Sequence, residues 1–301
     1  MKRNPLLYYI VYGLAAIIFS ISFIYFLGQA LHSLYIGKTL SVEIGTAFLN
    51  SLISALLSGT SQYLKNTVRN SRQARQLWKL ENPQNCAICL SAHRWTQPLS
   101  SSARVRIRYG VGEGQIQALP HIITSLHHAY GDRYAWGNIY QAHNLLASAA
   151  YIGDEDLILI GGPFTNPLTK RIISDVRNRI LIHPFTNDEL TITIPAPAVT
   201  SRHIVERDTV MINGIYPIIT DYAIILRVTQ QSDTKNRRVI LIAGCNTHST
   251  GAAARHFCHR LQNDGRWQAL QDKDYVAIIE CHVNAHQQNC AQTNLVFIHE
   301  I

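Results

Sequence analysis

The first 64 residues contain two long stretches without formal charge. From Asn4 to Gly37 no side chain is charged, and Leu6 to Leu31 is dense in Leu, Ile, Val, Phe and Tyr. A second uncharged stretch runs from Ile44 to Leu64. A helix needs about 20 apolar residues to cross a bilayer, whereas the apolar core of a cleaved signal peptide has only about 7 to 15. The pattern therefore predicts a transmembrane helical hairpin over residues 1–64, with a signal peptide as the weaker alternative.

The second stretch is less apolar than the first, and its small and hydroxyl residues recur every three or four positions. On a helix such residues form a stripe along one side. Because small residues let membrane helices pack closely, the stripe predicts packing against the first helix. Two alternatives stay open, a stripe that lines a wet pore in an oligomer and an ordinary helix of a soluble protein. The stripe consists of Asn50, Ser51, Ser54, Ser58, Ser61 and Gln62.

Basic residues flank the expected hairpin on both sides. Lys2 and Arg3 precede it, and the linker between the two stretches carries only Lys38 and Glu43. Because basic flanks stay on the cytoplasmic side of a membrane, we expect two spans with both termini in the cytoplasm, and membrane lipid as a partner. Residues 65–82 are then a basic helical stalk, ended by a proline. The basic residues of the stalk are Lys65, Arg69, Arg72, Arg75 and Lys79.

After residue 82, short apolar runs alternate with segments of helical period. Such alternation is typical of an α/β layered fold, and the β-rich stretch 180–220 adds further strands. We therefore predict an α/β Rossmann-like domain with a mixed sheet over residues 83–301. The expected strands are Cys86–Ser91, Asn138–His143, Leu157–Ile160, Leu190–Ile194, Tyr222–Val228, Arg238–Ile242, Tyr275–Glu280 and Leu295–Ile298, and the expected helices are Gln115–Tyr130, Ser249–Leu261 and one that opens at Thr165–Leu168.

Three glycine-containing loops precede expected helices. They are Gly110–Gln115, Gly161–Asn166 and Gly244–Gly251, and the last two follow strong strands. In open α/β sheets, ligands bind beyond the carboxyl ends of the strands. Helix N-termini there offer unpaired N–H groups that suit phosphate, and glycine lets the backbone approach the ligand. We expect a nucleotide to bind at these loops. The plain alternative is that glycine serves only the turn from strand to helix.

The candidate ligand-binding residues lie on these loops or directly after them. They are Gly112, Gly114, Gln115, Gly161, Gly162, Asn166, Thr169, Asn246, Thr247, His248, Ser249 and Thr250. Positive charge for a phosphate would come from Arg104, Arg106, Arg108, Arg171 or Arg227. For each of these residues an ordinary surface or capping role is the alternative.

The overall charge and the missing hydrolase motifs favour a binding domain. The chain has 27 Lys+Arg against 19 Asp+Glu, a formal net charge of +8, which suits an anionic small ligand. Neither a G-x-S-x-G elbow nor a G-x-x-x-x-G-K-[ST] phosphate loop is present. Carboxylates are scarce near the glycine loops, where Glu113 is the exception. We therefore expect no catalytic residues, no cofactor besides the nucleotide ligand and no direct nucleic-acid partner.

The six cysteines are interpreted as reduced thiols of a cytoplasmic domain. Cys86-x-x-Cys89 has a zinc-like spacing, and Cys281, His282 and Cys290 are further candidate ligands. Positions three apart in a strand face opposite sides, however. We therefore expect no metal site, and a structural zinc is the minor alternative.

Two segments carry a resemblance to a known class of proteins. Asp156–Asn166 is DLILIGGPFTN and Val239–Ala254 is VILIAGCNTHSTGAAA. Together with the expected hairpin, they resemble bacterial anti-phage effectors that join a two-helix membrane module to a Rossmann-like nucleotide sensor. The sensor is similar to the SLOG superfamily, especially its STALD-like branch associated with Sir2 and TIR proteins, with CARF-like or SAVED-like sensors as alternatives. The P-G-G-x-G-T-x-x-E pattern of the LOG phosphoribohydrolases is not present, so the resemblance implies binding more than hydrolysis.

The resemblance also implies a location and a function. The protein would lie in the bacterial inner membrane and bind a nucleotide second messenger, a cyclic oligonucleotide or an ADP-ribose derivative. Binding would make it form homo-oligomers and disrupt that membrane. The first alternative is a membrane-anchored nucleotide or NAD hydrolase, and the second is a scaffold that binds no ligand.

Overall fold

A computed structural model of the chain describes most of its second half and part of its first. The described residues are 20, 24, 28, 68–91, 93–98, 105–131, 138–142, 155–211, 214, 216–231, 235–284 and 289–301, without the side chains of 93–98, 105–110 and 289. The chain divides into two compact units, Met1–Val68 and Arg69–Ile301. The fold below is that of the second unit.

The expected membrane hairpin finds no support in this structure. Within the described ranges, no helix combines the length and the apolarity that crossing a bilayer requires. The helix Glu113–Tyr130 has 18 residues, but it carries a glutamate and three histidines. The predictions of a two-span transmembrane protein and of an inner-membrane location are therefore wrong on this finding. The stretches on which they rested, Leu6 to Leu31 and Ile44 to Leu64, lie outside the described residues except for positions 20, 24 and 28.

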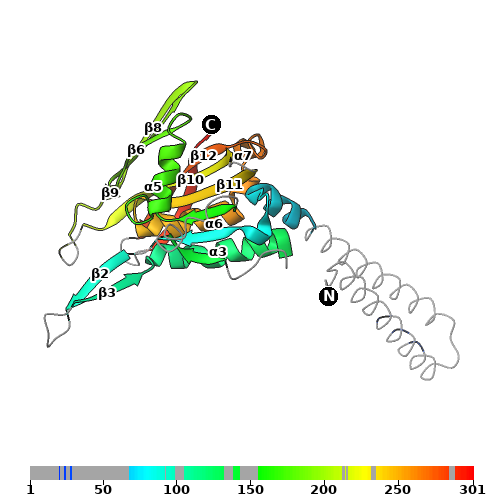
Figure 1. Cartoon of the computed structure of the whole chain (residues 1–301), viewed down its shortest axis with the longest axis horizontal. Coiled ribbons are helices and arrows are strands. Elements are labelled where there is room, and N and C mark those ends of the chain that lie inside the picture. The colour runs from blue at the N-terminus through cyan, green and yellow to red at the C-terminus, as the bar shows by residue number, and fades with distance from the viewer. Residues whose placement is uncertain are drawn as a thin grey trace, which may run out of the picture. The chain divides into compact units, whose positions relative to one another are not determined.

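An eight-stranded mixed sheet forms the centre of the second unit (Figure 1). Its order is β13-β12-β10-β11-β5-β1-β4, with the short β9 paired to β10. The four neighbours β4, β1, β5 and β11 are parallel, whereas β10, β12 and β13 are antiparallel to the strands beside them. The strands are β1 (Ala87–Leu90), β4 (Ile139–Gln141), β5 (Leu157–Ile160), β9 (Glu206–Arg207), β10 (Ile218–Gln231), β11 (Asn236–Gly244), β12 (Tyr275–Asn284) and β13 (Asn289–Glu300).

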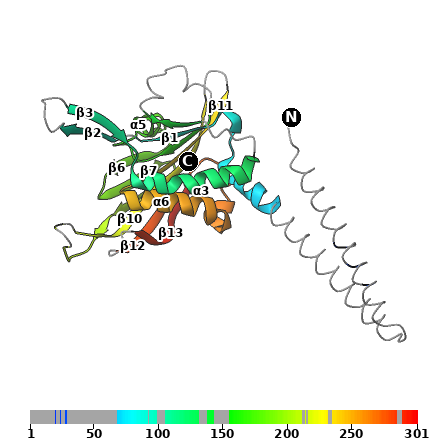
Figure 2. The same ribbon diagram turned by 90° about the horizontal axis from the view of Figure 1, so that it is seen from below.

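Two long helices, α3 (Glu113–Tyr130) and α6 (Thr247–His259), lie side by side on one face of the sheet (Figure 2). The helical residues 69–78 pack into the same layer, because Leu77 and Trp78 are fully buried. The indole N–H of Trp78 donates to Ser125 Oγ of α3 at 2.9 Å, and its ring meets Phe257 of α6 edge-on at 4.9 Å. A segment with a basic outer side thus contributes its apolar side to the core of the α/β unit. The short elements η1 (Pro83–Asn85), η4 (Leu261–Asn263) and α7 (Gly265–Gln268) complete the connections.

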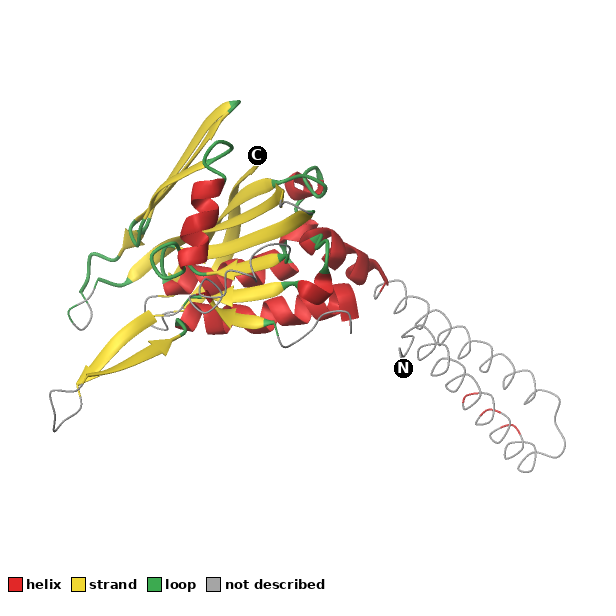
Figure 3. Ribbon diagram, viewed as in Figure 1, coloured by secondary structure: helices red, strands yellow, loops and turns green. Residues whose placement is uncertain are grey.

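The opposite face of the sheet is covered by α5 (Pro167–Asp175) and a three-stranded sheet (Figure 3). The small sheet consists of β6 (Leu181–Phe185), β7 (Glu189–Pro195) and β8 (Ala198–Ile204). Along β7 every second residue is buried, namely Leu190, Ile192 and Ile194. This period of two is that of a strand with one face against a core. A separate hairpin, β2 (His93–Pro98) with β3 (Val105–Gly110), projects from the unit as an arm (Figure 1).

Arg227 on β10 is fully buried and joins three segments of the chain. Its guanidinium donates to five backbone carbonyl oxygens at 2.6–3.1 Å, which belong to Gln76, Leu77, Leu270, Gln271 and Lys273. It also lies over the ring of Tyr275, 4.6 Å from the centroid. Arg227 was a candidate partner for phosphate. The structure corrects this, because both terminal nitrogens are committed to carbonyls inside the core, and Nε is buried there without a partner among the described residues.

The prediction of an α/β fold with a mixed sheet is confirmed. The reason is visible in the parallel strands. β1 and β5 are apolar throughout and buried at every position, as expected of parallel strands that are covered on both faces.

Candidate functional site

The helices that follow the parallel strands β1 and β5 pack on opposite faces of the sheet. α3 follows β1 along the chain and packs on one face, whereas α5 follows β5 and packs on the other. Numbered by their order in the chain, the parallel strands lie in the order 2-1-3-4. In open α/β sheets, ligands bind beyond the carboxyl ends of the strands at such a switch point. We call this region, formed by Ser91, Gly112–Gln115 and Gly161–Asn166, the switch-point site.

Gln115 lies at the centre of the switch-point site. Its side chain is 5% exposed and its Nε2 is hydrogen-bonded to Ser91 Oγ, at the end of β1. The other amide atom, Oε1, is buried and has no hydrogen-bond partner in the described part of the chain. Most buried polar groups are paired, so this amide is short of one partner. Gly161, at φ +108°, completes the site, since a Cβ there would lie 2.9 Å from both Gln115 Nε2 and Ser91 Oγ.

The N-terminus of α3 has backbone N–H groups that are available to a ligand. Its N-cap is Gly112, and no side chain caps the helix. The first N–H groups of a helix have no partner within it and carry the positive end of its dipole. Glu113 in this first turn is exposed and accepts from Gln117 Nε2 at 3.2 Å. An 18-residue helix thus points an uncapped N-terminus at the region beside Gln115.

The N-terminus of α5, in contrast, is satisfied by its own chain. Asn166 Oδ1 accepts from the N–H groups of Leu168 and Thr169 at 3.1 and 3.2 Å. Its Nδ2 lies 3.4 Å from the carbonyl oxygens of Cys89 and Ile160, so this one buried side chain joins the ends of β1 and β5. Thr169 Oγ1 donates to the Gly161 carbonyl at 2.9 Å. Asn166 and Thr169 therefore hold the loop in shape and have little capacity left for a ligand.

The N-terminus of α6 is occupied by a buried carboxylate, that of Asp221. Ser249 N donates to Asp221 Oδ2 at 3.1 Å, and Asn246 Nδ2 lies 3.2 Å from Asp221 Oδ1. Burial raises the pKa of Asp221, while the bonds from Ser249 and Asn246 act against that rise. Ser249 Oγ donates to the Tyr222 carbonyl at 2.9 Å. A phosphate here would meet a carboxylate at the place where it needs N–H groups.

Most of the remaining candidates around α6 also serve the fold. Thr250 Oγ1 accepts from Gly244 N at 3.0 Å and closes the loop after β11. Gly114 touches the backbone of Thr247, and a Cβ on it would collide with the Thr247 carbonyl oxygen. Thr247 is exposed and His248 is half-buried. Gly114 therefore allows α3 and α6 to pack closely, a role that is neither the expected ligand contact nor the plain turn from strand to helix.

The three glycine loops do not contribute equally to a single site. Gly161 and Gln115 come together, and Gly162 lies beside the loop of β11, because a Cβ on it would lie 3.7 Å from the Gly244 carbonyl oxygen. Arg171 is exposed on α5. Arg106 and Arg108 are on β3, whose side chains lie outside the description, and Arg104 lies outside the described residues.

Three residues of this region were not among the candidates, Ser91, Phe164 and Asp221. Ser91 is fully buried and directly follows β1, so the end of the predicted strand could have pointed to it. Phe164 follows Gly162-Pro163 and is 74% exposed, which is unusual for a large aromatic side chain. Asp221 is 28 residues from its partner Ser249, and no local pattern links the two.

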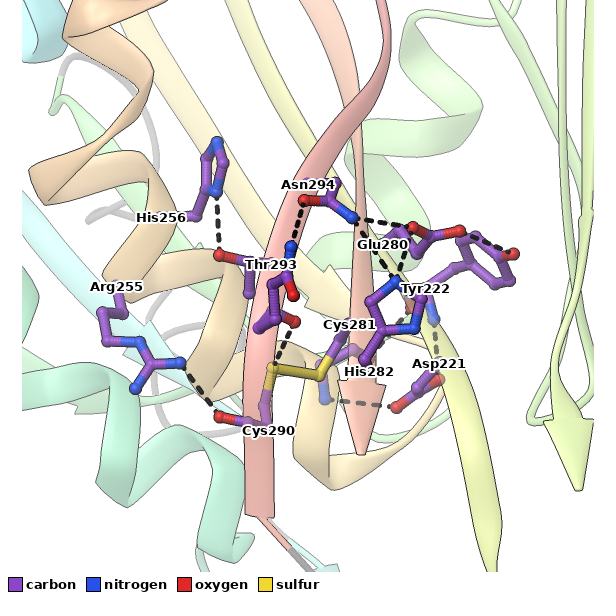
Figure 4. Close-up of a disulfide and its surroundings, with 12 residues drawn as sticks. Asp221, Tyr222, Arg255, His256, Glu280, Cys281, His282, Cys290, Thr293 and Asn294 are labelled. Carbon is purple, nitrogen blue, oxygen red and sulfur yellow. Dashed lines mark hydrogen bonds and ion pairs between the residues drawn. A yellow bond between two sulfur atoms is a disulfide. The ribbon is translucent and has the colours of Figure 1, made fainter. Parts of the chain in front are cut away.

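The described cysteines differ from the expectation of six reduced thiols. Cys281 on β12 and Cys290 on β13 form a disulfide (Figure 4). They are close because the chain turns back between the two antiparallel strands, which pair Val283 with Cys290. Cys86, Cys89, Cys245 and Cys258 are free and buried, and burial raises the pKa of the Cys89 thiol to about 12. Among the described residues, no group of three or more His, Cys, Asp or Glu is arranged to hold a metal ion.

Next to the disulfide, Figure 4 shows a polar cluster on the antiparallel half of the sheet. Glu280 accepts from His282 Nε2 at 3.0 Å and from Asn294 Nδ2 at 3.1 Å. The hydroxyl of Tyr222 donates to the other oxygen of Glu280 at 3.4 Å. Burial, followed by the nearby Glu280, raises the pKa of Tyr222 to about 12. These groups satisfy one another, so the cluster holds β10, β12 and β13 together.

The fold and the switch-point site define an open α/β sheet protein with a polar region beyond the parallel strands in which the buried Gln115 amide lacks one partner among the described residues. Comparison of the chain with protein-family models, curated proteins and solved structures gave no match. Its function is therefore inferred from the geometry of that region.

Proposed function

We propose that this domain binds a phosphate-bearing nucleotide at the switch-point site and works as a binding domain. The observation that carries the proposal is the Gln115 amide, which is buried, lacks one partner and lies beside the uncapped N-terminus of an 18-residue helix. Both features lie beyond the carboxyl ends of β1 and β5, where the fold class binds its ligands.

The first contact would be between phosphate oxygens and the N-terminus of α3. Its first-turn N–H groups and dipole favour an anion. The Ser91 hydroxyl both donates and accepts hydrogen bonds, and amide O and N atoms are interchangeable in this pairing. The Gln115 amide can therefore reverse, accept from Ser91 and present its N–H₂ group to the phosphate. Gly161 leaves room for this because it has no side chain.

The second contact would be between the base and Phe164. This ring is 74% exposed on the loop that follows β5. Stacking of a base on an aromatic side chain contributes about 1–3 kcal/mol. Phe164 would thus distinguish a nucleotide from inorganic phosphate, whereas Gln115 would contribute to the binding of both.

The ligands to test first are cyclic oligonucleotides and ADP-ribose derivatives, which the resemblance to SLOG-type sensors suggests. The purified full chain is titrated with these compounds by calorimetry, and its thermal unfolding is followed in parallel. A ligand that binds the folded state raises the apparent stability by mass action. We expect at least one nucleotide to bind, and failure of every compound in both classes would refute the proposal.

Variants test the position of the site. Gln115→Leu removes a hydrogen bond to a charged group, about 1.5–3 kcal/mol, and should weaken nucleotide binding at least about tenfold. Phe164→Ala should weaken binding of the nucleotide without weakening that of inorganic phosphate. Ile116→Ala is the matched control, since Ile116 is 57% exposed on the first turn of α3. Equal affinity of Gln115→Leu and Ile116→Ala for the nucleotide would place its site elsewhere.

A further inference from the structure

A pair of histidines lies on the outer side of the helical layer, apart from the switch-point site. His121 belongs to α3 and His259 is the last residue of α6. His121 Nδ1 and His259 Nε2 are 3.1 Å apart, and the two rings meet at 82°. The side chains come from two helices that lie next to each other, and Pro120 of α3 directly precedes His121 (Figure 2).

From this geometry we infer that His121 and His259 form a two-histidine site for a divalent transition-metal ion of the zinc type. Zinc binds imidazole nitrogen at about 2.0–2.1 Å. Two such nitrogens on one ion are therefore about 2.9 Å apart at a right angle and about 3.3 Å apart at the tetrahedral angle. The observed 3.1 Å lies between these separations. Imidazole is also a preferred ligand of zinc, copper and nickel.

The chemical state of the rings suits a metal. Metal binding requires a neutral imidazole with a free lone pair. The pKa of His121 and that of His259 are both lowered, in each case mainly by burial. The metal would take the lone pairs of His121 Nδ1 and His259 Nε2, with the ring protons on the opposite nitrogens. The ion would replace the hydrogen bond between the rings, after a rotation about χ2, a torsion that is broad for histidine.

Both histidines are open to water. His121 is half-buried and His259 is exposed. Arg255 is a cationic side chain whose charge acts on both rings, and His128 acts on His259. The guanidinium of Arg255 is turned toward β13, where it donates to the Cys290 carbonyl at 3.1 Å. Because no third ligand is in place among the described residues, water would complete the coordination.

A metal here would join α3 to α6 at the outer side of their contact. At the N-terminal ends, Gly114 already brings the two helices together. The inference does not depend on the nucleotide proposal, since neither histidine belongs to the switch-point site.

The test is a titration of the untagged full chain with Zn²⁺, and in parallel with Ni²⁺, at neutral pH. The variants are His121→Ala and His259→Ala. The control is His127→Ala, because His127 is exposed on the same helix. Removing even a group that only supports a metal ligand costs about 10–100-fold in affinity. We therefore expect each of the two variants to lose at least about tenfold in affinity at one site and the control to match the wild type.

Thermal unfolding without metal checks that the variants fold, and with metal it gives a second reading. The wild type and His127→Ala should gain stability from Zn²⁺ at this site, and His121→Ala and His259→Ala should lose that gain. The inference is overturned if the wild type binds no metal, or if all four proteins bind it with the same affinity and stoichiometry.

Discussion

Arg227 offers the sharpest test of how the α/β unit is held together. Its fully buried guanidinium makes five hydrogen bonds to backbone carbonyls of two segments, 76–77 and 270–273. These segments are far apart in the chain and both bond to this side chain, while Lys79, just beyond the first segment, reaches Asp272 of the second at 3.1 Å. Replacing Arg227 with Ala removes all five bonds and leaves the carbonyls in a partly dry environment.

The magnitude follows from the number and kind of these bonds. A hydrogen bond that involves a charged group contributes about 1.5–3 kcal/mol. The five are not additive, because one guanidinium shares its charge among them and the carbonyls of a turn can relax toward water. We therefore expect Arg227→Ala to lower the free energy of unfolding by about 4 kcal/mol, and Arg227→Lys, with three donors in place of five, by about 2 kcal/mol.

The assay is equilibrium unfolding in guanidinium chloride, followed by tryptophan fluorescence. Trp78 and Trp267 are suitable reporters, since both are buried to 99% or more. Arg171→Ala is the control, because Arg171 is exposed on α5 and surface substitutions usually stay within about 0.5 kcal/mol. If Arg227→Ala changed the free energy of unfolding by less than about 1 kcal/mol with an unchanged denaturant slope, the reasoning would be wrong.

Three further predictions concern other parts of the unit. Gly114→Ala should destabilise the protein by about 1–3 kcal/mol through overpacking of the α3–α6 contact. Gly265→Ala is the control in the same unfolding assay, because the space around its Cβ position is open, and it should change stability by less than about 0.5 kcal/mol. Burial lowers the pKa of His256 to about 4, so the unfolded chain binds a proton more readily than the folded one. The free energy of unfolding should therefore fall as the pH drops from about 6.5 to about 4. In the variant His256→Asn, unfolding measured across that range should show a shallower fall of this free energy. Reduction of the Cys281–Cys290 disulfide, whose cysteines are 9 positions apart in the chain, should cost about 2–3 kcal/mol. Alkylation of the denatured protein should then add two more groups after reduction than before it, and equal numbers would refute the bond.

The fold class was predictable because its signals are local. Runs such as Leu157–Ile160 are apolar at every position, which is typical of a buried parallel strand. The start of α5 was also predictable, since Asn166 caps the helix and Pro167 occupies its first turn. Helix and strand periods repeat every few residues, so a short window of sequence contains the information.

The candidate site was only partly predictable. The sequence placed three glycine loops at strand ends, and Gln115 and Gly161 do meet there. Asn166, Thr169 and Thr250 instead satisfy backbone groups of their own loops, and Ser249 satisfies the carbonyl of Tyr222 on β10. A polar side chain near a helix start suits both a cap and a ligand contact, and the sequence pattern is the same for the two.

The sequence by itself thus determined the alternation of strands and helices and the residue types at each loop. Only the tertiary structure decided which strands are neighbours, and with them the pairing of Asp221 with α6, of Gln115 with Ser91 and of His121 with His259. The last of these pairs is separated by 138 residues. Such contacts depend on the order of strands in the sheet and on the face to which each helix returns. The strand order and the helix faces are set by burial of the whole core, and no short stretch of sequence contains that information.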